Sequence, residues 1–181
     1  MQEQGIVRRV DELGRLVIPK ELRKTLRIKE GDPLEIYARQ NELVLKKYSP
    51  INSFKNLSSA VADGIEQILD KACIITDCDS VICVSNGRCK DLLGKNISNE
   101  LDRVLKERKS LLLSRVEGSS IISVVLEDNT QAENQIIVPI VNAGDCYGAI
   151  IVFDKDKTNR FSSFDLKLIQ LGSSFLSSQL D

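Results

Sequence analysis

The first fifty residues are patterned like a folded unit, but they are too few to bury a hydrophobic core of their own. They contain no cysteine and no histidine, so neither a disulfide nor an ordinary zinc site can stabilise them. Units of this size without such support bury too little apolar surface to fold alone. We therefore expect two copies of the chain to share one core in this region.

The residue pattern of this unit predicts short strands around one short helix. Two extended stretches flank a polar turn, DELG, at residues 11–14. Pro19 has a fixed φ and needs no hydrogen-bond partner, which suits the first turn of a helix. The expected elements are strands at 5–10 and 15–18, a helix from Lys20 to Arg27 or Ile28, a turn at 31–33, and hairpin strands at 34–39 and 42–47.

Charge divides the chain into a basic and an acidic part. Residues 1–47 carry eleven Lys and Arg against eight Asp and Glu, a net charge of +3. The remaining residues carry fourteen basic and eighteen acidic side chains, a net charge of −4. Such asymmetry indicates a nucleic-acid-binding module joined to a second domain. Because Pro50 and small polar residues interrupt the pattern, we expect a first domain at 1–50, a linker at 51–55 and a second domain at 56–181.

The basic residues of the expected helix cluster on one face at about 100° per residue, with Leu22 and Leu26 on the other side. One interpretation is a solvated surface; the other is a cationic face held toward phosphates. The second is favoured because arginines also cluster before the helix, and because a dimer doubles the number of phosphate contacts. The candidate DNA-binding residues are Arg8, Arg9, Arg15, Lys20, Arg23, Lys24 and Arg27.

The stretch GIVRRVDELGRLVIPKELRKTLRIKEGDPLEIYARQNELVLKKY, residues 5–48, resembles the swapped-hairpin DNA-binding domain of the AbrB family of bacterial transition-state regulators. The resemblance implies an interlocked dimer in which two chains exchange hairpins, with DNA contacts through Arg8, Arg15 and Arg23. Lys24 stands where the family often has arginine, so it keeps the charge but loses the planar fork of a guanidinium. The resemblance also implies that DNA shape and flexibility are read more than a strict base sequence.

Residues 54–181 alternate between helical and strand patterns, so the whole chain is expected to be α+β. Apolar residues recur every three or four positions from Phe54 to Ala72, which predicts an amphipathic helix. Ser162 and Asp165 form a capping-box-like pattern at the start of the last helix. The apolar face of that helix either lies in the core or pairs with the first helix and with another subunit; it comprises Phe164, Leu168, Leu171 and Phe175. The other expected elements are strands at 72–76, 81–85, 121–127, 135–141 and 147–153, and a helix at 99–114.

This order of elements, with IIVPIVNAGDCYGAIIVF at residues 136–153, resembles a GAF domain. The resemblance implies either a pocket for an unidentified small-molecule effector or a module for dimerisation. The residues leave both open, because a fold does not fix a function. No other cofactor is expected.

Missing residue types argue against several functions. The chain has no histidine, which removes Ser-His-Asp and Cys-His catalytic sites and the commonest general base. We therefore expect no enzyme activity and no catalytic residues. The five cysteines lack the paired spacing of zinc sites, so no metal is expected, and Cys73, Cys78 and Cys83 are predicted to be small buried residues in strands. No apolar run is long enough for a transmembrane helix and no signal peptide is visible, which predicts a cytoplasmic protein without a membrane partner.

In combination, the two domains resemble a family of transcription regulators that act in the forespore of endospore-forming bacteria. This resemblance implies double-stranded DNA as a partner and sporulation genes as targets, bound by an interlocked oligomer. A tetramer follows if both domains pair. The alternative is the antitoxin of a toxin–antitoxin pair, whose DNA-binding domain can share the swapped-hairpin fold. Antitoxins usually add a disordered tail, however, whereas residues 54–181 are patterned as a folded domain.

Overall fold

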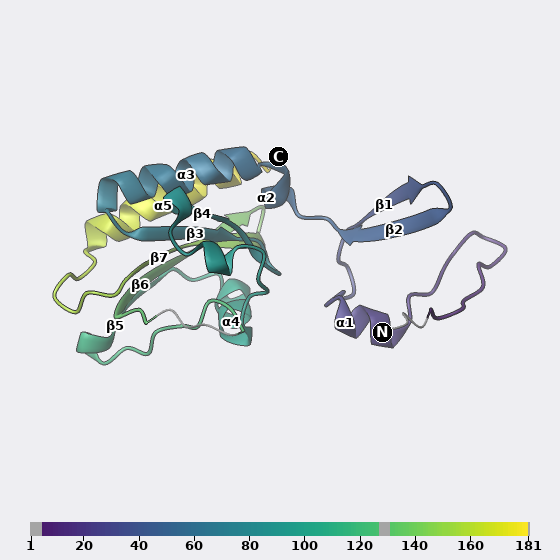
Figure 1. Cartoon of the computed structure of the whole chain (residues 1–181), viewed down its shortest axis with the longest axis horizontal. Helices are drawn as coiled ribbons and strands as arrows, with labels where there is room; N and C mark the ends of the chain where they lie inside the picture. Colours follow the sequence, from purple (N-terminus) through teal and green to yellow (C-terminus); the bar gives the residue numbers. More distant parts are fainter. Residues whose placement is uncertain (1–4, 127–130, 181) are drawn as a thin grey trace. The chain divides into compact units, whose positions relative to one another are not determined.

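The chain forms two compact units in the computed structural model, which describes residues 5–126 and 131–180 (Figure 1). The first unit spans Met1–Tyr48 and the second Ser49–Asp181. The stretch expected as a linker at 51–55 is helical instead. α2 (Pro50–Ser53) begins where the Ser49 hydroxyl accepts the N–H of Asn52 at 3.3 Å. Because Ile51 is buried in the core of the second unit, this segment is fixed to that unit.

Residues 5–48 of the first unit form one short helix and one hairpin. α1 (Lys20–Thr25) begins after Pro19, as expected, and ends before Arg27, which adopts a left-handed φ of 53°. The helix is therefore two to three residues shorter than predicted. β1 (Leu34–Arg39) and β2 (Glu42–Lys47) pair antiparallel, which confirms the predicted hairpin.

The strands expected at 5–10 and 15–18 do not form in the single chain, so that prediction is wrong for one copy. The turn between them does form, with the Gly14 N–H donating to the Asp11 carbonyl at 3.0 Å. A β-strand needs a neighbour to accept and donate its backbone hydrogen bonds. No other segment of the described residues pairs with this stretch in a sheet.

The second unit is built on a five-stranded antiparallel sheet with the order β4-β3-β7-β6-β5. Its strands are β3 (Ala72–Thr76), β4 (Val81–Val84), β5 (Leu111–Ser114), β6 (Asn134–Asn142) and β7 (Asp145–Asp154). Four of these were predicted to within two residues at each end. The central strands are buried over most of their length, which explains their run of Ile and Val.

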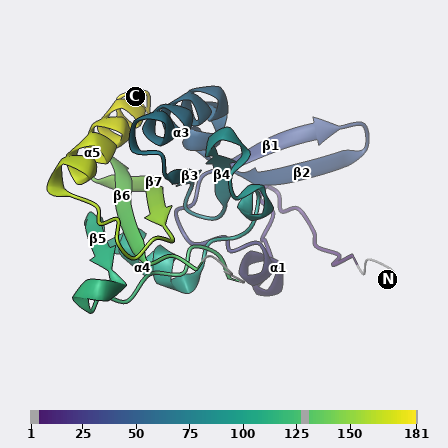
Figure 2. The same cartoon turned by 60° about the vertical axis from the view of Figure 1, so that its left-hand side comes forward.

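Helices cover both faces of this sheet (Figures 1 and 2). The helices are α3 (Lys55–Leu69), α4 (Asn99–Glu107) and α5 (Ser163–Ser177), with short 3₁₀ turns η1 (Ser85–Gly87), η2 (Lys90–Leu92) and η3 (Arg115–Glu117). Alternate residues of β3 belong to different cores: Cys73 and Ile75 pack under α3 and α5, whereas Ile74 packs under α4. The predicted capping box of α5 is present in both directions, between Ser162 and Asp165. Among residues 5–126 and 131–180, every helix is too short or too polar to span a bilayer.

The helix expected at 99–114 is wrong in its second half. α4 ends at Glu107 because Arg108 adopts a left-handed φ of 56°. The chain then turns, and Leu111 to Ser114 pair with β6. A run as short as LLLS fits a helix or a buried strand equally well, so only its tertiary partner decides.

The strand expected at 121–127 is also wrong over residues 121–126, and residue 127 lies outside the described residues. The side chain of Gln135 makes the hydrogen bonds to Ile122 that a neighbouring strand would otherwise make. The Gln135 amide donates to the Ile122 carbonyl at 3.0 Å and accepts the Ile122 N–H at 2.9 Å. Among the residues that the structure describes, a single bridge, between Ile97 and Val125, links this segment to another in the manner of paired strands.

The cysteine predictions are confirmed for two residues and wrong for the third. Cys73 in β3 and Cys83 in β4 are buried. Cys78 is exposed, because it lies in the turn between these strands. That turn is closed by the Asp77 carboxylate, which accepts the N–H groups of Asp79 at 2.8 Å and Ser80 at 2.7 Å.

Candidate nucleic-acid interface

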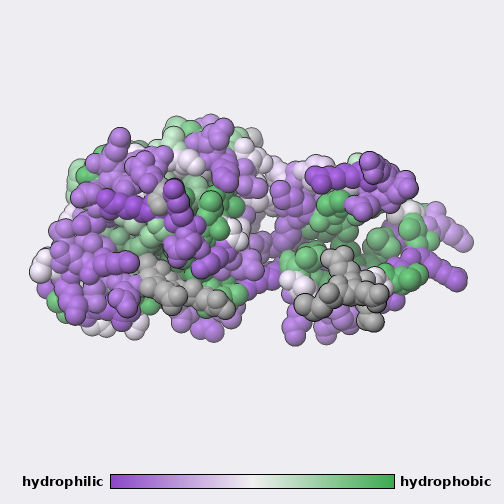
Figure 3. All heavy atoms as spheres, in the orientation of Figure 1, coloured by the Kyte–Doolittle hydropathy of each residue, from purple (hydrophilic) through white to green (hydrophobic). Residues whose placement is uncertain are grey.

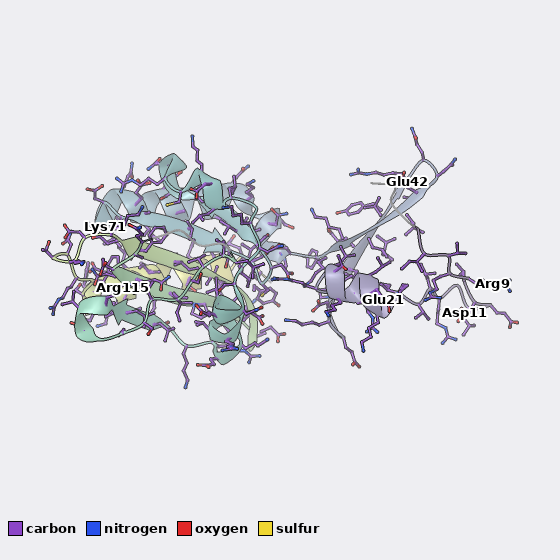
Figure 4. All side chains as sticks on the ribbon, turned by 60° about the horizontal axis from the view of Figure 1, so that its bottom comes forward. Arg9, Asp11, Glu21, Glu42, Lys71 and Arg115 are labelled. Carbon is purple, nitrogen blue, oxygen red and sulfur yellow. The ribbon has the colours of Figure 1, made fainter. Side chains whose placement is uncertain are left out.

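The candidate DNA-binding residues lie on three segments of the first unit. Two precede the DELG turn, one follows it, and the others lie on or just after α1. Figure 4 shows Arg9 and Asp11 on the N-terminal segment and Glu21 on α1. The exposed members of the set are Arg8, Arg9, Arg15, Lys20, Arg23 and Lys24. These cations are therefore accessible to a polyanion within this unit.

The helix presents a smaller cationic face than predicted. Lys20, Arg23 and Lys24 fall within α1, and the latter two occupy its last turn, where cations interact favourably with the helix dipole. Arg27 does not continue this face, because it lies beyond the helix end and is half-buried. Its carbonyl accepts the Lys47 ammonium at 3.2 Å, which ties the residue to the hairpin. Lys47 also pairs with Asp32 at 3.1 Å.

Arg15 is positioned by Asp11 across the turn. The Arg15 Nε lies 2.7 Å from the Asp11 carboxylate, whose other oxygen accepts the N–H groups of Arg15 at 2.8 Å and Leu13 at 3.0 Å. These bonds lower the pKa of the Asp11 carboxyl, first through the Arg15 backbone N–H and then through its guanidinium. Both side chains are well exposed, so the ion pair is weak and a phosphate can compete for the guanidinium.

This role of Asp11 was not among the sequence-based predictions. The signal was present in the DELGR turn itself. An Asp that opens a turn commonly accepts backbone N–H groups two or more residues later.

The apolar side chains of the first unit are not covered within one chain. Pro19 is the single buried residue among the described residues 5–48. Val7 is 89% exposed and Val17 is 75% exposed, and Figure 3 shows apolar side chains reaching the surface of this unit. Other large exposed apolar residues are Ile6, Val10, Leu13, Leu16, Leu22, Leu26, Ile36 and Leu43. A contiguous segment with this much exposed apolar surface is typical of an interface between chains.

The second unit also exposes an apolar face, on the pair α3 and α5. Of the two alternatives for the last helix, the core interpretation is wrong: Phe164 is 70% and Leu171 is 68% exposed, and Phe175 is exposed as well. The core side of α5 carries Ile169, Ser173 and Leu176 instead. Ile68 of α3 is exposed too. Because α3 and α5 lie side by side, we name Ile68, Phe164, Leu171 and Phe175 the α3/α5 face.

No group of three or more Cys, Asp or Glu side chains is arranged to hold a metal ion within the described parts of the chain.

Two family models match the chain, one for each unit. The model described as "Stage V sporulation protein T C-terminal, transcription factor" matches residues 53–181. The model described as "Antidote-toxin recognition MazE, bacterial antitoxin" matches residues 7–53.

Similar proteins support the same division. Stage V sporulation protein T of Bacillus subtilis (strain 168) is 41% identical over 182 residues, which cover 100% of this chain and 99% of the relative. The transition state regulatory protein AbrB of the same organism is 62% identical over 50 residues, which cover 28% of this chain and 52% of AbrB. The GAF-B domain of DevS from Mycobacterium smegmatis aligns with a TM-score of 0.56 over 73% of this chain and 93% of that domain, at 10% identity. This last likeness concerns the fold alone.

Fold and comparisons together define the class: a two-domain α+β protein with an AbrB-like N-terminal domain and a GAF-like C-terminal domain. The chain belongs to the stage V sporulation protein T family.

Proposed function

We propose that this chain is a DNA-binding transcription regulator of sporulation genes that acts as an oligomer and has no enzyme activity. The observation that carries the proposal is the likeness to stage V sporulation protein T over the full length of both chains. The exposed cations of the first unit support it, because they supply the charge that a phosphate backbone attracts.

In this proposal two copies complete the first unit together. Their exchanged segments give residues 5–10 and 15–18 the strand partners that one chain lacks, and cover the apolar side chains between them. Each Val, Leu or Ile that becomes fully buried contributes about 1.5–3 kcal/mol before the entropy of ordering is subtracted. Pairing also brings two sets of arginines to one DNA duplex.

The second unit assembles copies through the α3/α5 face. Large aromatic and aliphatic side chains exposed on adjacent helices favour pairing with the same helices of another copy. If each copy pairs with one neighbour through its first unit and with a different neighbour through its second unit, the smallest closed assembly is a tetramer.

The antitoxin alternative is weaker. Its support is the match of residues 7–53 to a family described as a bacterial antitoxin. An antitoxin of this kind needs a segment that folds only on its toxin, whereas Ser49–Asp181 forms a compact unit with its own core.

A salt titration of DNA binding tests the proposal. Arg8→Ala, Arg15→Ala and Arg23→Ala are each expected to weaken binding and to lower the slope of log affinity against log salt by about one per lost phosphate contact. Arg103→Ala is the matched control, since it removes an exposed guanidinium from α4 in the other unit. Unchanged affinity and slope in all three test variants would exclude this surface as the DNA-binding site.

A further inference from the structure

Two cysteines from distant parts of the chain meet at one end of the sheet. Cys78 follows β3 in the turn to β4, and Cys146 is the second residue of β7. β3 and β7 are antiparallel neighbours in which Thr76 lies opposite Ala149. The end of one strand therefore lies beside the start of the other, and positions 68 apart in sequence come together (Figure 1).

The contact between the two residues is direct. The Cys78 thiol donates to the Cys146 carbonyl at 3.1 Å, and the Cys146 thiol donates to the Gly148 carbonyl at 3.4 Å. Gly148 makes this approach possible: a Cβ at that position would lie 1.9 Å from the Thr76 carbonyl oxygen. A bulge between Ile140 and Val141 in the pairing of β6 with β7 shifts the register next to Cys146. The backbone positions of Cys78 and Cys146 therefore follow from the close approach of β3 and β7 and do not depend on a bond between the thiols.

The two thiols differ in a way that suits sulfur chemistry. The neighbouring Cys78 thiol lowers the pKa of Cys146, and the charge of Arg108 contributes in the same direction. The neighbouring Cys146 raises the pKa of Cys78. Cys146 is therefore the better nucleophile toward an oxidant. Cys78 lies where its sulfur can attack the oxidised Cys146 sulfur in a second step.

The remaining cysteines differ from this pair in pKa, burial or position in the fold. Burial raises the pKa of Cys83 to about 11, and the pKa of the buried Cys73 is raised as well. Cys89 is half-buried and directly precedes η2. Cys78 is exposed and Cys146 half-buried, so an oxidant can reach the pair.

We propose that Cys78 and Cys146 form a reversible disulfide within one chain when the protein meets a peroxide. The Cys146 thiolate attacks one oxygen of the peroxide, the O–O bond breaks, and the leaving hydroxide takes up a proton to become water. Cys146 is then a sulfenic acid. The Cys78 sulfur attacks it, the S–O bond breaks, the S–S bond forms, and the Cys78 proton leaves with the hydroxyl as a second water. The peroxide gains two electrons, the two thiols lose two, and a dithiol reductant reverses the change.

The disulfide would close a long loop that holds β4, α4, β5 and β6, which restricts the unfolded chain. We expect the oxidised full-length chain to melt several degrees above the reduced one. Oxidation thereby makes the second unit more rigid at the end of the sheet where these two turns meet.

Mass spectrometry of the full chain tests the proposal. After reduction with dithiothreitol and treatment with a small molar excess of hydrogen peroxide, the intact mass should fall by about 2 Da, the thiol count should fall from five to three, and digestion should give a peptide pair linked through Cys78 and Cys146. Dithiothreitol should restore all five thiols. Non-reducing electrophoresis should show that the link lies within one chain.

Variants separate the pair from general oxidation. Cys78→Ser should abolish the linked peptide and leave a Cys146 sulfenic acid that dimedone traps. Cys89→Ser is the matched control and should oxidise like the unaltered chain. A linked pair that includes Cys89, a link between two chains, or five free thiols after oxidation of the unaltered chain would each overturn the proposal.

Discussion

Single residues decide how the cations of the first unit are presented. The Asp11 carboxylate binds both the backbone N–H and the guanidinium of Arg15. This ion pair positions Arg15 but offsets part of its positive charge. Both side chains remain exposed, so the arrangement positions the guanidinium without burying it. Arg23 and Lys24 are positioned differently, by a helix that starts directly after a proline.

The carboxyl of Asp11 is expected to titrate below its ordinary pKa, as measured by NMR in the full chain. Because the folded pKa is the lower one, the stability that this turn gains is complete above the unfolded pKa and is lost as pH falls through the folded pKa. In Arg15→Gln the pKa should rise only part of the way, since the backbone N–H of residue 15 is the larger cause. Asp156, whose pKa is lowered by the N–H and hydroxyl of Thr158, should not change in that variant. An Asp11 with an ordinary pKa in the unaltered chain would contradict the described turn.

At the scale of elements, the second unit depends on close backbone contacts that side-chain patterns do not reveal. β3 and β7 approach each other so closely at Gly148 that a side chain there would overlap the Thr76 carbonyl. Gly64, in α3, has open space around its Cα. Substitution by alanine is therefore expected to have opposite effects on stability at the two glycines.

Gly148→Ala is expected to destabilise the full chain by on the order of 3 kcal/mol or more, because the backbone of β3 must move. Gly64→Ala should instead raise stability by about 0.5–1 kcal/mol, since alanine is the better helix former and nothing obstructs it. Urea unfolding of both variants provides the measurement. Equal stability of Gly148→Ala and the unaltered chain would show that the two strands are not this close.

Elements whose partners lie nearby in sequence were predictable, and those with distant partners were not. The hairpin across Gln40–Asn41 and the capping box at Ser162 are local patterns, and both are confirmed. β5 was missed because Leu111–Ser114 becomes a strand only beside β6. Residues 121–126 were misassigned because the backbone N–H and carbonyl of Ile122 bond to the side chain of Gln135 instead of to a neighbouring strand. The candidate cations could be named from the sequence, but the early helix end that removes Arg27 from their face could not.

At the scale of the whole molecule, both units are left with apolar surface that one chain does not cover. In the first unit this surface includes residues 5–10 and 15–18, which form no strand in a single chain, and in the second it is the α3/α5 face. The first of these was predictable from the sequence, because fifty residues without a disulfide or a metal cannot enclose a core. The α3/α5 face was not predictable, because the sequence does not show which side of α5 packs against the sheet.

Leu171→Glu and Phe175→Glu are expected to lower the oligomeric state of the full chain by disrupting the α3/α5 face. A buried carboxylate without a partner is costly at an interface, so association should weaken strongly while each chain stays folded. Asn159→Glu adds the same charge on an exposed loop and serves as the control. Sedimentation velocity measures the outcome. Unaltered sedimentation of both variants would remove this face from the assembly.

The central claim is that the first unit is completed by a second copy of the chain. NMR of a mixed sample tests it most directly, with one population of full-length chains labelled at Val and Leu methyl groups and the other unlabelled. We predict contacts between copies for Val7, Val17 and Leu43, which one chain leaves exposed. If these methyl groups are found packed against residues of their own chain alone, in a first unit that is folded, the account is contradicted.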